Sequence, residues 1–415
     1  MKQTTHQAVQ RLYLLLTFGN TLAASLIWGI NTLFLLDAGL NNFEAFAANA
    51  FFTLGMVIFE VPTGVIADTM GRLMSFLLGT ITLSATTWLY FLLWEFHAPF
   101  WEWAVVSLLL GLGFTFFSGA VEAWLVDALA ATNYPGELET VFGRGQMATG
   151  AAMLIGSVSG GIIAQYTSLG IPFLIRAGIL ALIFALAFFF MKDLGFSPDR
   201  NTGPVKAVKR ILRASVDNGF RNPPVKWLML AAPFAGGVGI YVFYAAQPFL
   251  LQLYGDSHAY TVAGLVAAII ACAQITGGYL APKIRALPYR PVTLMVTGTV
   301  ISASTLLLLG MISHFVAALL LIVVWGLVFA ALMPIRQSYI NKLIPSAQRA
   351  TVLSFDSLMS SAGSVVSQPL LGRAADVWSY GTSFAISGMI QIVAAPLIAR
   401  SQDVKVVHTG KGKLR

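Results

Sequence analysis

The sequence contains little charge, almost no cysteine and few histidines. Only 10% of its 415 residues are Asp, Glu, Lys or Arg, against about 25% in an ordinary soluble protein, which excludes a water-soluble globular fold. The single cysteine, Cys272, excludes an intrachain disulfide and a cysteine metal cluster, and it leaves the redox compartment undetermined. The five histidines lack zinc-ligand spacing. No metal site is expected.

Motifs of several function classes are also missing. The chain has no Gly-x-x-x-x-Gly-Lys-Ser/Thr run, so ATP is not expected to drive it, and no Gly-x-Ser-x-Gly elbow that would indicate hydrolysis. The net charge of +8 comes from basic residues scattered between apolar runs, not massed on one face as in nucleic-acid binding proteins. We therefore expect no enzyme activity, no cofactor and no nucleic-acid partner.

Long apolar runs dominate the sequence. Apolar residues make up 57% of it, and the mean hydropathy is +0.78. A helix needs about 20 mostly apolar residues to cross the roughly 30 Å hydrocarbon layer of a bilayer. Segments of this kind lie near 10–37, 43–68, 73–94, 101–128, 141–166, 169–191, 225–253, 259–283, 289–312, 315–341, 349–372 and 380–400.

These segments predict an all-α membrane protein with twelve transmembrane helices in two pseudo-symmetric six-helix bundles. The predicted bundles are residues 1–192 and 225–400, joined by a linker, 193–224, and followed by a tail, 401–415. Within the linker, Pro204–Phe220 places an apolar stripe opposite a basic face, which predicts an amphipathic helix on the inner leaflet. The alternative is a plain tether.

The distribution of Lys and Arg predicts the orientation of the chain. With a cytoplasmic N-terminus, 23 of the 25 basic residues lie on the cytoplasmic side, and only Arg176 and Arg373 lie outside. Short cytoplasmic loops carry such an excess. We therefore expect a multi-pass protein of the plasma membrane, a bacterial inner membrane, with both termini cytoplasmic.

The two halves share a weak internal similarity. Gly64 falls opposite Gly278 and Glu122 opposite Arg336, both at an offset of 214 residues. Equal offsets are the expected trace of a duplicated six-helix unit.

The turn after the second predicted span carries the most specific motif. It reads Gly64-Val-Ile-Ala-Asp68-Thr-Met-Gly71-Arg72. Gly64 permits close helix approach, Gly71 permits a tight turn, and Asp68 and Arg72 supply charges for a gate. This pattern resembles motif A of the major facilitator superfamily, although Leu73 stands where a further basic residue is common. The alternative is a turn that only orders the hairpin.

The resemblance implies a monomeric transporter that works by alternating access. It also implies that motif A stabilises an outward-open state and that spans 1, 4, 7 and 10 line a central cavity. In the fifth span, Gly156, Gly160 and Gly161 are similar to the glycine motif of many drug antiporters, with Ser157 in place of its proline. These glycines are equally consistent with helix packing alone.

Acidic residues inside the apolar spans are the candidates for ion coupling, because a charge in a membrane is costly. Glu60, Glu122 and Asp356 are candidates for proton coupling or substrate contact. For Glu60 the alternative is a permanent salt bridge to Arg144 or another cation, and Asp356 is placed to pair with Arg336.

Glu122 and Asp127 lie about 140° apart around a helix, so they face different ways. We assign Glu122 to the transport path. Asp127, with Arg72 or Arg144 as its partner, is assigned to the edge of the gate. The alternative is that both acids form gate salt bridges.

Amide and aromatic side chains form polar faces on three spans. These candidate cavity residues are Asn20, Trp28, Asn31, Asn49, Tyr241, Tyr244 and Gln247. Such a cavity suits lipophilic or amphipathic compounds, including cations, and suits a strongly anionic solute poorly. Core packing is the alternative for each aromatic residue.

Together these features predict a secondary transporter in the lipid bilayer that exports amphipathic small molecules, with H⁺ as the coupling ion. One alternative is a proton-coupled symporter that imports a metabolite. A lipid translocator or a transport-inactive membrane receptor would share the same architecture.

Overall fold

The computed structural model describes residues 5–117, 120–196, 222–344 and 349–402, and in these ranges every regular element is a helix. The first six predicted spans are α1 (His6–Trp28) with α2 (Asn31–Asp37), α3 (Asn42–Met70), α4 (Arg72–Glu95), α5 (Phe100–Thr115) with α6 (Ala120–Ala131), α7 (Leu138–Tyr166) and α8 (Ile171–Phe190). The second six are α10 (Pro223–Ala235) with α11 (Gly239–Tyr254), α12 (Tyr260–Arg285), α13 (Pro291–Leu309), α14 (Phe315–Leu343), α15 (Arg349–Val377), and α16 (Tyr380–Ile392) with α17 (Ala394–Arg400). The predicted fold class is confirmed. The predicted amphipathic linker helix lies outside the described residues.

Eleven of these spans are long and apolar enough to cross a membrane, counting α1 and α2 as one span bent by 48°. The twelfth, α15, is as long as the others but more polar, because it carries a row of serines and Gln368. Ser364, Ser367 and Gln368 are all buried. The polar side chains of α15 therefore face other helices of the protein and not the lipid.

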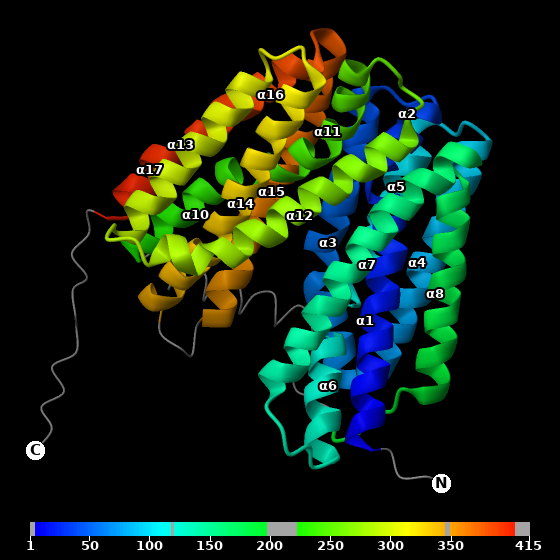
Figure 1. Ribbon diagram of the computed structural model, residues 1–415. Coiled ribbons are helices and arrows are strands. Elements are labelled where there is room, and N and C mark those ends of the chain that lie inside the picture. The colour runs from blue at the N-terminus through cyan, green and yellow to red at the C-terminus, as the bar shows by residue number, and fades with distance from the viewer. Residues whose placement is uncertain (1–4, 118–119, 197–221, 345–348, 403–415) are drawn as a thin grey trace, which may run out of the picture.

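The helices form two bundles, as predicted. Figure 1 shows α1–α8 in one bundle and α10–α17 in the other, packed together at the end far from both termini and diverging toward the termini. We call these the closed end and the open end. The contacts between bundles come chiefly from α3 with α15 and from α7 with α12. The second and fifth spans of the first bundle thus meet the eleventh and eighth, as a two-fold arrangement of repeats requires.

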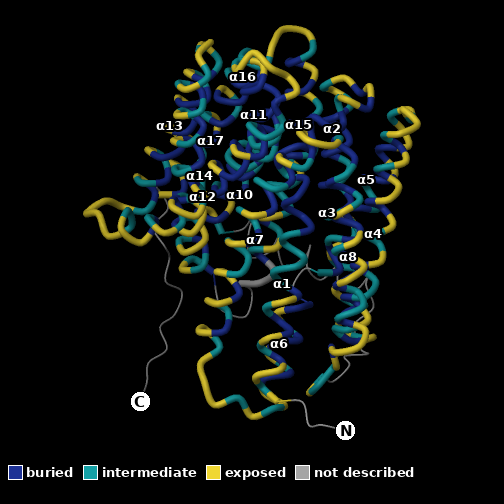
Figure 2. The backbone as a smooth tube through the Cα atoms, turned by 45° about the vertical axis from the view of Figure 1, so that its right-hand side comes forward, coloured by how far each residue is buried: buried dark blue, intermediate teal, exposed yellow. Residues whose placement is uncertain are grey.

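Each bundle has its own apolar interior, and Figure 2 shows buried backbone concentrated there. Trp103 and Trp124 fill the first bundle at its closed and open ends, and Trp325 fills the second. The cluster around Trp325 also takes in Phe46 of α3. The core of the first bundle in turn takes in Leu251, Ala259 and Ala263 of the second. In the described part of the chain, the two apolar cores therefore meet at the closed end.

Three glycines bring the bundles into backbone contact near the closed end. A Cβ atom added to Gly264 on α12 would lie 2.6 Å from the Ser157 carbonyl oxygen and 3.0 Å from the Cα of Gly161, both on α7. A Cβ added to Gly29 would lie 2.8 Å from the Cα of Gly264. Backbones approach this closely only where side chains are absent. The closed end therefore depends on these glycines.

We expect Gly264→Leu to hold the closed end apart, because overpacking a tight contact costs about 1–3 kcal/mol. Spin labels in the 38–41 and 255–259 turns, in a Cys272→Ser background, should report a longer distance than in the parent protein. Gly278→Leu is the matched control, since a Cβ at Gly278 on the same helix meets nothing within 4 Å. An unchanged distance distribution in Gly264→Leu would contradict this role for the glycine contact.

Candidate functional site

Buried amide side chains cross the interface between the bundles near the closed end. Asn31 Nδ2 donates to Asn49 Oδ1 at 3.1 Å within the first bundle. One turn further along α3, Thr53 Oγ1 accepts from Gln368 Nε2 of α15 at 3.4 Å. Gln247 Nε2 of α11 donates to the Trp28 carbonyl at 2.6 Å. We call Asn31, Asn49, Thr53, Gln247 and Gln368 the polar seam.

The seam contains several of the residues predicted to line a cavity. Asn31, Asn49 and Gln247 are all buried in it. Tyr244 lies beside it, with its carbonyl accepting from Thr32 Oγ1 at 3.1 Å. Tyr241 instead points into the second bundle, where its hydroxyl contacts Ser383. Asn20, half-buried on α1, lies outside this set.

An acidic side chain closes the rim of the closed end. Asp376, on the last turn of α15, accepts the Asn42 backbone N–H at 3.0 Å and the Phe43 backbone N–H at 2.8 Å. These N–H groups are unsatisfied donors at the start of α3, where the helix dipole favours a negative charge. Tyr380 adds a hydrogen bond from its hydroxyl to the Asn42 side chain. One carboxylate thus ties the two bundles together.

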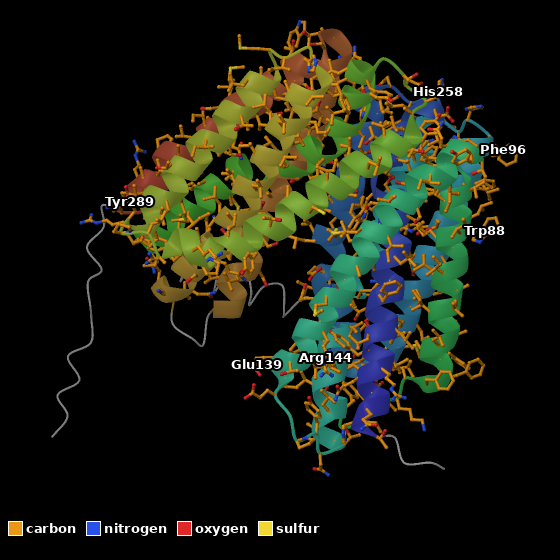
Figure 3. The ribbon with its side chains drawn as sticks, in the orientation of Figure 1. Trp88, Phe96, Glu139, Arg144, His258 and Tyr289 are labelled. Carbon is orange, nitrogen blue, oxygen red and sulfur yellow. The ribbon has the colours of Figure 1, made fainter. Side chains whose placement is uncertain are left out.

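The predicted coupling acids of the first bundle lie on the other side of the molecule. Glu60 on α3 and Glu122 on α6 are exposed, and Asp127 is half-buried. Tyr13 of α1 lies close enough to Glu122 to interact with it electrostatically. Figure 3 shows Arg144 on the part of α7 near the open end and His258 at the closed end. Glu60 and Glu122 are therefore not enclosed by other helices in this conformation.

The motif A turn at the open end is held within one bundle. Arg72 pairs with Asp68 at 2.7 Å, one helical turn away, and not with Asp127. Asp193, which follows α8, accepts the Leu73 backbone N–H at 2.9 Å. Burial raises the pKa of Asp193, and the backbone N–H groups of Leu73 and Arg72 act in the opposite direction. The turn is therefore capped by a half-buried acid that the sequence motif does not contain.

Gly71 is needed at this turn for two reasons. Its φ of +105° is a conformation that residues with a side chain rarely adopt. An added Cβ would also lie 2.2 Å from Asp193 Oδ2. In contrast, a Cβ at Gly64 would meet nothing within 4 Å, so no neighbour requires a glycine at that position in this conformation.

The second bundle contains a cavity of about 300 Å³ with an ion pair in its wall. Arg336 of α14 contacts both carboxylate oxygens of Asp356 on α15, one of them at 2.6 Å, and also donates to the Leu228 carbonyl of α10 at 3.0 Å. Ser360 and Gln391 add polar groups to the lining. The predicted partners Arg336 and Asp356 are thus joined, in a bidentate pair that links three helices.

The glycine run on α7 lies at two helix contacts. A Cβ at Gly156 or Gly160 would overlap atoms of α1, including Ser25 Oγ and the Leu26 carbonyl oxygen. Gly161 faces α12, across the interface between the bundles. Gly156 and Gly160 allow close packing of α7 on α1 within the first bundle. Gly161 allows close packing of α7 on α12 between the bundles, near the closed end.

Sequence reasoning missed four residues of this site. Gln368 and Asp376 are ordinary polar residues whose partners come from a distant part of the chain, and Asp193 lies in a loop. Arg176 is different, because it lies within an apolar span and is only 3% exposed. The rule that flagged buried acids would have flagged it too, had cations been included.

No group of three His, Cys, Asp or Glu side chains that could hold a metal ion is found in the part of the chain that the structure describes. The candidate site has three parts: the polar seam at the closed end, the exposed acids at the open end, and the Arg336–Asp356 ion pair beside the cavity.

Comparisons with known proteins point to one family. The model of the Major Facilitator Superfamily matches residues 13–327 and 289–413. The uncharacterized MFS-type transporter YxaM of Bacillus subtilis is 24% identical over 399 residues, which cover 91% of this chain and 90% of YxaM. Multidrug resistance protein MdtG of Salmonella typhimurium is 25% identical over 328 residues, 77% of this chain and 74% of MdtG.

Solved structures agree on the fold. A mutant form of the nucleoside transporter NupG superposes with a TM-score of 0.82 at 12% identity, over 95% of this chain and 100% of that one. A D-xylose-proton symporter superposes with a TM-score of 0.69 at 16% identity, over 95% and 96%. At these identities the likeness concerns the fold alone.

We expect Asp356→Asn to destabilise the protein by roughly 3 kcal/mol. Breaking a buried ion pair costs about 3–5 kcal/mol, and the partial exposure of Arg336 (19%) and Asp356 (10%) favours the lower end. Thermal unfolding in detergent micelles, followed by tryptophan fluorescence, measures the change. Asp68→Asn is the control, because Asp68 is 55% exposed and such pairs contribute about 0–1 kcal/mol. Equal effects of the two substitutions would contradict a stabilising role for the Arg336–Asp356 pair.

Proposed function

The chain belongs to the Major Facilitator Superfamily, a family of membrane transporters, and from this premise we propose that it is a proton-coupled secondary transporter that exports amphipathic small molecules by alternating access. The protein works in the plasma membrane of a bacterium as a monomer. Its open end, which carries both termini, faces the cytoplasm.

The observation that carries this proposal is the contrast between the two ends of the molecule. At the closed end, Gln247 and Gln368 donate hydrogen bonds from one bundle to the other, and Asp376 accepts one across the same interface. At the open end, the Arg72–Asp68 and Arg336–Asp356 pairs each join residues of one bundle. A rocking motion that breaks the first set of contacts and brings the motif A turn toward the second bundle would alternate access to the space between them.

Glu60 and Glu122 are the groups proposed to couple protons to this motion. Both are exposed at the open end, so the proposal places each carboxylate in contact with the cytoplasm in this conformation. When the open end closes, the same carboxylates lose solvent, and loss of solvent favours the protonated form of an acid. A proton is thus taken up and released as the solvation of the acid changes.

Export of amphipathic compounds is supported by two features. The relative MdtG is named a multidrug resistance protein, and the glycine run on α7 lies where its third member contacts the other bundle. The polar seam supplies amides to an amphipathic ligand once the closed end opens, and hydrogen bonds to the backbone carbonyls of Trp28 and Tyr244 place these two aromatic residues next to it in the chain fold. This combination suits molecules with one polar group and an apolar body.

Purified protein in liposomes with an imposed pH gradient should move protons when an amphiphile is added. We expect Glu60→Gln or Glu122→Gln to abolish this movement, because a glutamine holds no exchangeable charge. A pH-sensitive dye inside the liposomes reports the flux.

Glu139→Gln is the matched control, since Glu139 is an exposed acid near the open end on α7. It should leave proton movement unchanged. If substrate moved into the liposomes together with protons, down the proton gradient, the protein would be a symporter and the export proposal would be wrong. Full activity in both glutamine variants would remove Glu60 and Glu122 from the coupling mechanism.

A further inference from the structure

Arg176 is a buried cation without a counter-charge. It lies on the second turn of α8, inside an apolar span, and it is 3% exposed. Its Nε hydrogen is buried without an acceptor. Among the described residues, its guanidinium forms no ion pair with a carboxylate. A buried guanidinium without a carboxylate partner destabilises a membrane protein. We therefore look for a role of Arg176 other than stabilising the fold.

The surroundings of Arg176 are aromatic and lie beneath the interface between the bundles. The phenol groups of Tyr90 on α4 and Tyr244 on α11 lie close enough to interact with it electrostatically. Tyr244 comes from the second bundle, and its backbone is hydrogen-bonded to Thr32 of α2. Arg176 therefore interacts electrostatically across the interface with a residue of the other bundle.

The depth of Arg176 matches that of the polar seam. The ring of Phe173, one turn earlier on α8, stacks on Phe34 of α2 with 3.9 Å between ring centroids. The helix α2 runs toward the closed end, and Asn31 precedes Phe34 by one turn. The helix α8 runs away from the closed end, and Arg176 follows Phe173 by one turn. Asn31 and Arg176 therefore both lie one turn further from the closed end than the stacked rings of Phe34 and Phe173.

The seam also contains polar atoms without partners. Asn49 Nδ2, Gln247 Oε1 and Gln368 Oε1 are buried and make no hydrogen bond among the described residues. Buried polar groups are normally satisfied, and each exception needs a reason. Four unsatisfied atoms, the Arg176 Nε included, lie at or just beneath one interface, which indicates a surface built to meet a ligand when that interface opens.

We propose that Arg176 binds the negatively charged group of the transported molecule, an organic carboxylate with an aromatic or apolar body, when the closed end opens. This inference rests on the alternating access proposed above, because Tyr244 must withdraw before a ligand reaches the guanidinium. Arg176 then supplies a charge-assisted, two-pronged contact to the carboxylate. The ligand charge is opposite to that of the lipophilic cations considered from the sequence, because that expectation rested on the acidic residues and did not include Arg176.

Equilibrium dialysis of the full-length protein in detergent tests this assignment with three probes on one carbon skeleton: phenylbutyrate, phenylbutyramide and phenylbutylamine. We expect saturable binding of phenylbutyrate by the parent protein, weakened at least about tenfold in Arg176→Gln and partly restored in Arg176→Lys. Binding of the neutral amide should change little. Arg373→Gln removes an exposed arginine on α15, one turn before Asp376 at the closed end. This variant should bind phenylbutyrate like the parent.

Thermal unfolding separates this role from a structural one. Because Arg176 has no counter-charge, Arg176→Gln should unfold at the same temperature as the parent or higher. A lower unfolding temperature with equal loss of all three probes would overturn the proposal. So would equal phenylbutyrate binding in Arg176→Gln, or no saturable phenylbutyrate binding by the parent. The dialysis needs no gradient, so failure of proton coupling in liposomes would leave its result standing.

Discussion

The constraint on which the structure depends is that a bilayer offers no hydrogen-bond partners to polar groups. The chain therefore places its polar side chains between helices, and many of them lie between the two bundles. Gln247 and Gln368 are satisfied only in part, each through its amide nitrogen. Gln247 donates to the opposite bundle, and Gln368 donates both to Thr53 of the opposite bundle and to the Ser364 carbonyl of its own helix. The hydrogen bonds of this interface fix its geometry, but some of its buried polar atoms have no partner. Such an interface is less stable than a fully hydrogen-bonded one, as is required of a contact that forms and breaks in each transport cycle.

The two ends of the molecule use charge differently. At the closed end, Asp376 binds the exposed N–H groups of α3 and so joins the bundles through the dipole of a helix. At the open end, Asp193 caps α4 in a similar way, but both partners belong to one bundle. The same device thus stabilises a turn in one place and an interface in the other. Which of the two it does depends only on whether the acid and the helix start lie in the same six-helix unit.

Much of the fold could be predicted from the sequence, because lipid imposes a length and an apolarity on every span that touches it. The sequence predicts residues 349–372 as a span although the corresponding helix, α15, is the most polar of the twelve. It also predicts the pairing of Arg336 with Asp356, since two opposite charges in neighbouring spans of one bundle have few other partners. In contrast, the pairing of Asn42 with Asp376 joins residues more than three hundred positions apart, and no local pattern encodes such a contact. The placement of Asn31 and Gln247 in a closed seam depends on which end of the molecule is shut, and that is a property of the conformation.

The polarity of α15 has a consequence for how the protein is made. A helix with six serines and a glutamine along its length partitions weakly into lipid on its own. In the finished protein its polar side is covered by α10, α11 and, above all, α3. The eleventh span therefore gains a stable place in the bilayer only when the second span is already there to receive it, and biogenesis of the C-terminal half depends on prior insertion of the N-terminal half.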